Sequence, residues 1–339
     1  MEFLSDYGLF LAKAITFVVV VAIIIGMVAS AGQKSKPEKL SIKHLNGKLD
    51  SLKKHLQEKV LSKKQLKELS KNEKKESKEG KKADDDNKER VYVLNFNGDI
   101  KASQSEQLKD EITAILSLDG YVDEVVVKVE SGGGMVHQYG YAASQLDRIK
   151  KRGIPLTVCV DKVAASGGYM MAVVADKIIA APFAVIGSIG VIAQLPNFNK
   201  LLKKNDVDFE VHTAGEYKRT LTMFGENTDK AREKFKEDLQ EVHELFKGFI
   251  TKYRNEIDID KVANGDVWYG QDAIKQNLVD EILTSDDYLL TRAQTANIYE
   301  LKSEDKKSLL KRLSSGAETG ISKAVETALN KIAFHKWYH

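Results

Sequence analysis

Apolar and charged positions divide the chain into four segments, the first of which contains an uncharged run over residues 14–33. At a rise of about 1.5 Å per residue, a helix of this length spans a hydrocarbon core of about 30 Å. We therefore predict a single-pass membrane anchor over residues 1–33. A cleaved signal peptide is the alternative, but the apolar run exceeds a typical signal core, and the leader carries Glu2 and Asp6 in place of basic residues.

A lysine-rich connector is predicted over residues 34–90. Residues 33–90 hold 19 Lys and Arg against 11 Asp and Glu. Residues 71–90 contain one apolar residue, Ala83, which predicts an unfolded tether. Four leucines are spaced 4, 3 and 4 residues apart, which predicts a helix with one apolar stripe: Leu45, Leu49, Leu52 and Leu56. The helix is too short for a coiled coil, and it could instead lie on the membrane or on the body of the protein.

Short apolar strands alternate with helices over residues 91–290. Strands are predicted at 91–96, 124–129 and 156–160, with helices at about 103–116, at 136–151 and from 166 onward. This alternation predicts an α/β fold, a parallel sheet covered by helices with functional loops at the carboxyl ends of the strands. A long amphipathic helix is predicted from 228 to about 256, and residues 291–339 are predicted to form a basic amphipathic tail.

Composition and charge exclude several classes of protein. A chain of 339 residues that is 42% hydrophobic and 30% charged is not wholly disordered. Its one cysteine, Cys159, cannot form an intrachain disulfide, and the seven histidines lack the spacing of a zinc site, so we predict no metal and no cofactor. The positive charge lies in the connector, and the remainder of the chain is mildly acidic. We therefore predict no nucleic-acid partner.

Candidate chemistry begins at Ser166, which lies between an apolar strand and an apolar helix within Ala-Ala-Ser-Gly-Gly-Tyr. A serine at such an elbow exposes its hydroxyl, although capping of the helix is the ordinary alternative. A second glycine-rich loop, residues 130–134, follows the preceding strand. Backbone N–H groups of Gly133 or Gly134 and of Gly167 can therefore converge on one oxyanion, which points to acyl transfer.

The base that would activate this serine is not evident from the residues alone. The pentad G-x-S-x-G is absent because position 164 is Ala, and His137 and His212 have no recognisable triad context. A lysine can serve when it is desolvated, but the chain contains many lysines.

Several motifs in order resemble the signal peptide peptidase A (protease IV) family, and the amino-terminal part resembles its SohB branch. They are residues 129–169, Gly187-Ser-Ile-Gly-Val191, Gly215-Glu-Tyr-Lys-Arg219, and Gly265-Asp-Val-Trp-Tyr-Gly270 with Leu278-Val-Asp280. The resemblance implies a Clp/crotonase-like fold and a membrane-anchored serine endopeptidase with a Ser/Lys dyad.

Matched by motif, the resemblance implies Ser166 as nucleophile, Lys218 as general base and Ser188 as the hydroxyl that orients the lysine. Gly134 and Gly167 would supply the oxyanion N–H groups. One departure affects the site: the family often has Asn-Ser-Pro-Gly-Gly where this chain has Glu-Ser-Gly-Gly-Gly over 130–134. Loss of the proline predicts a more flexible loop.

The resemblance also implies a homo-oligomeric ring in which serine and lysine come from neighbouring protomers. Its substrates would be signal peptides or unfolded envelope proteins, and the catalytic domain would lie outside the inner (cytoplasmic) membrane. Five lysines after the anchor favour the cytoplasm instead, but that rule applies best to short loops, so we follow the family. A crotonase-like acyl-CoA enzyme and a non-catalytic membrane scaffold are the competing hypotheses.

Overall fold

The computed structural model describes residues 40–78 and 88–303, together with a few isolated positions before residue 40. Ser41–Lys302 form one compact unit. The predicted anchor lies almost entirely outside the described residues, as do residues 304–339 of the predicted tail. Within the described part, no helix has the length and apolar character needed to cross a membrane.

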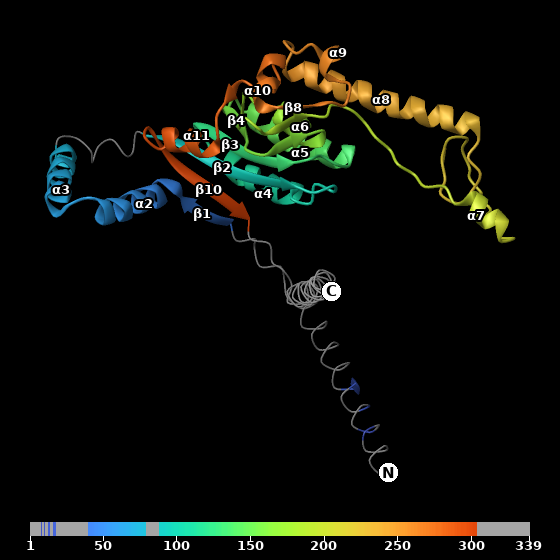
Figure 1. Cartoon of the computed structure of the whole chain (residues 1–339), viewed down its shortest axis with the longest axis horizontal. Coiled ribbons are helices and arrows are strands. Elements are labelled where there is room, and N and C mark those ends of the chain that lie inside the picture. Colours follow the sequence, from blue (N-terminus) through green and yellow to red (C-terminus); the bar gives the residue numbers. More distant parts are fainter. Residues whose placement is uncertain are drawn as a thin grey trace, which may run out of the picture. The chain divides into compact units, whose positions relative to one another are not determined.

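A mostly parallel sheet of ten described strands forms the centre of the compact unit (Figure 1). Seven strands run in the order β1-β10-β2-β3-β4-β6-β9, while β5, β7 and β8 continue from β3. β7 and β8 pair in antiparallel orientation. The strands are β1 (Leu40–His44), β2 (Glu89–Gly98), β3 (Glu124–Ser131), β4 (Leu156–Val160), β5 (Val163–Ala165), β6 (Lys177–Ala180), β7 (Val185–Gly187), β8 (Val267–Tyr269), β9 (Glu281–Ile282) and β10 (Ala296–Ser303).

Helices cover this sheet, which confirms the predicted α/β class. The central strands β3 and β4 are almost entirely buried, as expected for continuous apolar runs enclosed on both faces. The helices are α2 (Leu45–Val60), α3 (Lys63–Lys78), α4 (Ser105–Leu116), α5 (Val136–Lys151), α6 (Gly167–Ala172), α7 (Asn199–Lys204), α8 (Asp229–Tyr253), α9 (Ile259–Val262), α10 (Gly270–Ala273), the 3₁₀ turn η1 (Ile274–Gln276) and α11 (Ser285–Arg292).

The sheet continues past both predicted borders of the catalytic segment. From beyond residue 290, β10 pairs in parallel with β2, and β1 lies beside it at the edge. Asn46, in the first turn of α2, fixes this edge: its Nδ2 donates to the carbonyls of Ala293 (3.1 Å) and Ala296 (2.8 Å), and its Oδ1 accepts from Ile298 N–H (2.8 Å). The start of the connector is therefore part of the folded unit.

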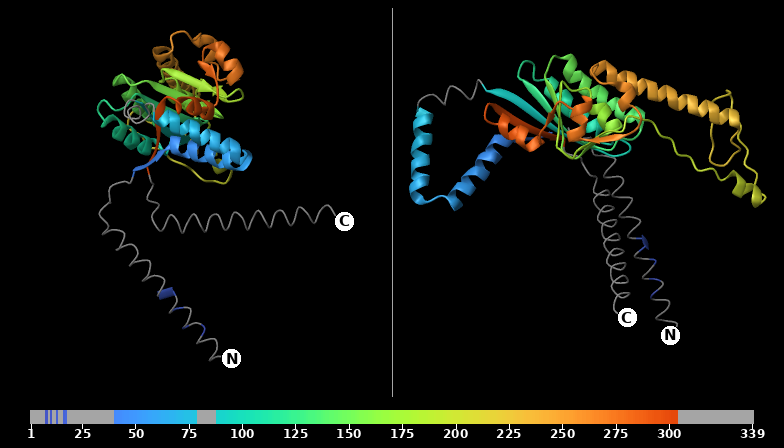
Figure 2. Two further views of the ribbon diagram at one scale, coloured as in Figure 1. Left: turned by 90° about the vertical axis from the view of Figure 1, so that its left-hand side faces the viewer. Right: turned by 45° about the horizontal axis from the view of Figure 1, so that its top comes forward.

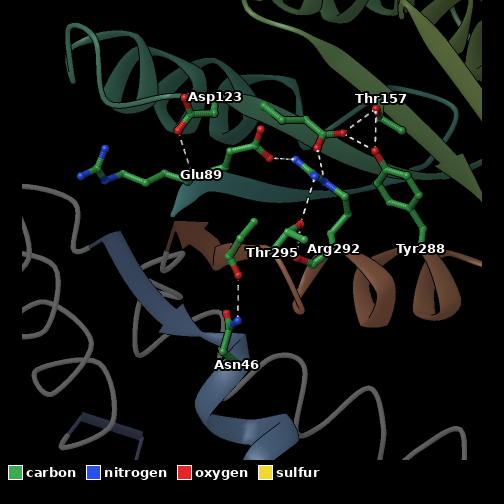
Figure 3. A network of polar contacts seen from close by, with 10 residues as sticks. Asn46, Glu89, Asp123, Thr157, Tyr288, Arg292 and Thr295 are labelled. Carbon is green, nitrogen blue, oxygen red and sulfur yellow. Dashed lines mark hydrogen bonds and ion pairs between the residues drawn. The ribbon is translucent and has the colours of Figure 1, made fainter. Parts of the chain in front are cut away.

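A partly buried ion-pair network closes the amino-terminal end of the sheet (Figure 3). Arg292 of α11 donates from Nε to Glu124 (2.9 Å) and from Nη2 to Glu89 (2.7 Å). Thr157 Oγ1 donates to the same Glu124 carboxylate at 2.7 Å. These contacts join β2, β3 and β4 at the end opposite the glycine-rich loop that follows Ser131.

The leucine stripe of the connector lies on α2, but it is mostly uncovered. Leu45 packs against the core, whereas Leu52 and Leu56 are 59% and 64% exposed. Residues 71–78, predicted as part of an unfolded tether, continue α3 as helix.

The long helix α8 packs on the unit through its second half, where Phe246 and Ile250 are buried. Its first half extends beyond the sheet, with α7 near its amino end (Figures 1 and 2). Thr228 begins the helix by accepting a hydrogen bond from Ala231 N–H. Helix α8 therefore connects the core to α7 and the segment between α7 and α8.

Candidate active site

Ser166 occupies the elbow between β5 and α6, in a conformation rare for a residue with a side chain, with φ 52° and ψ −118°. Its N–H donates to Gly187 O at 2.7 Å, and its carbonyl accepts from Met170 N–H at 2.9 Å. The side chain makes no capping hydrogen bond to α6, so its hydroxyl is not used to begin the helix. Backbone strain of this kind, of order 1–3 kcal/mol, persists only where the surroundings impose it.

The loop after β3 lies directly against this elbow, as the adjacent glycine-rich motifs predicted. Ser131 of β3 pairs with Ala164 of β5, so the two loops leave the sheet side by side. Gly133 has φ +87°, and a Cβ there would stand 2.6 Å from Gly167 N. A close approach of the two backbones therefore requires glycine at this position.

Gly134 and Gly167 present backbone N–H groups that donate to no acceptor among the described residues. Both residues line a small cleft together with Ser166. Two uncommitted donors next to a serine hydroxyl are the arrangement that stabilises a tetrahedral oxyanion.

Apolar side chains form the other walls of this cleft, including Val136, Met170 and Val191, and α8 contributes Val242 and Phe246. Its volume is about 20 Å³, which is room for about one water molecule. The sequence predicted an amphipathic helix over this stretch, and no local signal marked Val242 and Phe246 as cleft residues.

Ser188 follows β7 at a second positive-φ position, φ 51°, next to the elbow. The register Ala165↔Gly187 places the two serine turns at the same edge, and the Ser188 N–H donates to Asp266 O at 2.7 Å. Gly187, with φ +98°, lies under the Trp268 ring, where a Cβ would come within 2.7 Å of Cε3.

Lys218 lies apart from these groups, exposed in the segment between α7 and α8. Its neighbour Glu216 accepts from Lys230 Nζ at 2.7 Å, and Lys234 lies over the Tyr217 ring at 5.8 Å. Lys230 and the cleft residue Phe246 are sixteen residues apart on α8, about 24 Å along the helix axis. One chain therefore brings together Ser166, Gly134, Gly167 and Ser188, but not Lys218.

The described residues contain no cluster of His, Cys, Asp or Glu that could hold a metal ion. An α/β sheet holds a strained serine next to two free N–H donors, and acyl-transfer enzymes use this combination of groups.

Family models describing the N-terminal part of peptidase family S49 and peptidase family S49 match residues 2–146 and 148–299. The chain is 47% identical over 344 residues to a probable protease SohB of Haemophilus influenzae, across 98% of this chain and 96% of that protein. It is 46% identical to a probable protease SohB of Buchnera aphidicola over the full length of both. Protease 4 of Haemophilus influenzae is 30% identical over 57% of this chain and 32% of its own length. The chain belongs to peptidase family S49 and is a protease.

Proposed function

We propose that the chain is a serine endopeptidase of the Clp/crotonase-like type, in which Ser166 is the nucleophile and Lys218 the general base. Ser188 orients the lysine amine, and the N–H groups of Gly134 and Gly167 bind the oxyanion. The observation that carries the proposal is the Ser166 elbow, which holds an uncommitted hydroxyl beside two uncommitted N–H donors.

In the proposed reaction, a neutral Lys218 Nζ takes the proton of the Ser166 hydroxyl while Oγ attacks the peptide carbonyl carbon. The carbonyl oxygen becomes an oxyanion that accepts from the two glycine N–H groups. The protonated lysine then gives its proton to the leaving amine, and the C–N bond breaks. Water, deprotonated by the same lysine, hydrolyses the acyl-serine ester.

Lys218 must be desolvated to act in this way, yet it is exposed in the single chain. We infer that it reaches Ser166 of a neighbouring copy in a closed homo-oligomer. The segments around it support this, because they carry unusually exposed aromatic side chains that a neighbour could cover: Phe198, Phe209 and Phe224, which are 41%, 44% and 39% exposed. A head-to-tail interface closes into a ring when the rotation between neighbouring copies is a whole fraction of a turn.

The proposed substrates are signal peptides and unfolded envelope proteins, and the proposed location is the inner membrane, held by the uncharged run at 14–33. An assembled ring would admit extended chains more readily than folded ones. The narrow apolar cleft favours small or apolar side chains beside the scissile bond.

Casein cleavage by the detergent-solubilised full chain tests the dyad. Ser166→Ala and Lys218→Ala should each abolish cleavage without changing assembly. Lys200→Ala, which changes another exposed lysine on the preceding helix α7, should leave cleavage intact. Co-expressed Ser166→Ala and Lys218→Ala chains should regain activity, since about a quarter of the sites in a randomly mixed ring combine an intact serine with an intact lysine. Full activity of Ser166→Ala would overturn the proposal, and an inert mixture would overturn the sharing of sites.

A further inference from the structure

We propose that Ser131 and Tyr139 are positioning residues for the oxyanion loop. Their hydroxyls form a series of hydrogen bonds that connects the loop after β3 to the loop after β2. These hydrogen bonds fix the orientation of the peptide group that presents the Gly134 N–H. The inference rests on the proposed function of Ser166.

The two hydroxyls link both loops. Tyr139 Oη donates to Asp99 O at 2.7 Å, and Ser131 Oγ lies 2.5 Å from Tyr139 Oη and 3.3 Å from Gly98 O. Because the Tyr139 proton is used on Asp99 O, the Ser131 hydroxyl is the donor in the shorter of its two contacts. Ser131 Oγ in turn accepts from Gly133 N–H at 3.1 Å. The Gly133 N–H therefore points back into the protein, and the next N–H, that of Gly134, remains uncommitted.

The two hydroxyls lie in a site with little freedom. Tyr139 is fully buried and Ser131 is 2% exposed. The Tyr139 ring fills the space that a Cβ would need at Gly167 and, with its hydroxyl, at Gly98. One side chain thus contacts the loop after β2 and the residue that follows the nucleophile.

Asp99 is itself held in place. Its carboxylate accepts from the N–H (2.8 Å) and hydroxyl (2.7 Å) of Ser103, while its carbonyl accepts from Tyr139. Burial raises the pKa of Tyr139, and the phenol therefore stays a donor across the physiological pH range.

Gly132, Gly133 and Gly134 give this loop no proline or side chain that could restrict its backbone. The hydroxyl chain supplies that restraint from outside the loop. Losing it should misplace the Gly134 donor, and a misplacement of about 1 Å at a reacting centre can lower the rate by up to about 100-fold.

Tyr139→Phe tests the inference, because it removes the hydroxyl and keeps the ring. Its matched control is Tyr169→Phe, since Tyr169 is also fully buried and donates to a backbone carbonyl, that of Leu278, at 3.0 Å. In the full-length oligomer, measured below both melting temperatures, Tyr139→Phe should lower kcat with little change in KM. Tyr169→Phe should lower only the melting temperature.

Ser131→Ala should reproduce the loss of kcat, and the double variant with Tyr139→Phe should be no worse than either single variant, because both break one chain. The inference is overturned if Tyr139→Phe leaves kcat unchanged, or if both tyrosine variants lower kcat alike. Full activity of Ser166→Ala would instead show that the proposed site itself is wrong, so the two failures are distinguishable.

Discussion

Ser166 N–H and Gly187 O form a hydrogen bond of 2.7 Å that couples the nucleophile elbow to the turn that carries Ser188. Both serines lie at positive φ, and the bond holds their two turns in register. A substitution in the turn after β7 should therefore change the position of Ser166.

Gly187→Ala should lower both stability and activity. Position 187 has φ +98°, and the added Cβ would meet the Trp268 ring and push on the carbonyl that binds Ser166. Gly153→Ala is the control, because it also has positive φ, +71°, but nothing lies within 4 Å of the added atom. Thermal unfolding should show a loss of about 1–2 kcal/mol for the control and more for Gly187→Ala, with casein cleavage reduced only in the latter. Equal effects on cleavage would contradict the coupling.

Substitution by alanine should have opposite effects at two neighbouring glycines of the oxyanion loop. A Cβ added at Gly132 would meet open space, so Gly132→Ala should keep activity and raise stability by about 0.4–1 kcal/mol through the unfolded chain. Gly133→Ala would clash with Gly167 N at a positive φ and should abolish cleavage. Denaturant melts and cleavage rates of the two variants check this. A tolerated Gly133→Ala would refute the close approach of the loops.

The partly buried ion pair of Arg254 and Asp280 should make part of the stability depend on pH. Burial opposes the carboxylate charge, but the bidentate Arg254 contact and the Ile178 N–H outweigh it and hold the pKa of Asp280 below its usual range. A depressed pKa stabilises the fold above the unfolded value of about 3.9 and ceases to do so as the pH falls through the folded value.

The difference in melting temperature between the parent and Asp280→Asn should therefore be large near pH 7 and shrink below about pH 4. Asp272→Asn serves as a control, because its pair with Lys275 is exposed and should matter little at either pH. A difference for Asp280→Asn that stays constant from pH 7 to pH 3 would argue against a charged pair.

Cys159 should be unreactive in the folded protein. It is buried in β4, and burial raises the pKa of its thiol to about 12, so almost no thiolate forms at neutral pH. Ellman's reagent should label the chain only after denaturation. Rapid labelling of the native protein would show that β4 opens easily.

The central strands were predictable because they are continuous apolar runs enclosed on both faces: the expected strand at 156–160 matches β4, and those at 91–96 and 124–129 fall within β2 and β3. β1 and β10 escaped prediction, because β1 is a short, largely exposed edge strand and β10 alternates buried and partly exposed positions without a continuous apolar run. The Clp/crotonase-like assignment and the residue roles stay predictions.

In the site, the elbow and the glycine loops could be predicted because each lies within a few residues of a strand end. The cleft wall from Val242 and Phe246 and the hydroxyl chain through Tyr139 could not, since an apolar or aromatic residue on an amphipathic helix gives the same pattern as ordinary core. Lys218 lies in the segment between α7 and α8, which contacts the first turn of α8 through the Glu216–Lys230 ion pair. No local sequence pattern predicts that contact.

The segment that carries Lys218 contacts the first turn of α8, far from the cleft. In a single folded chain, Ser166 therefore has no Lys218 amine within reach. Under the proposed dyad, newly made copies are inert until enough of them gather, and the cleavage rate rises steeply with their density. Such an enzyme needs no removable propeptide to protect the cell during synthesis, and dilution alone would switch it off.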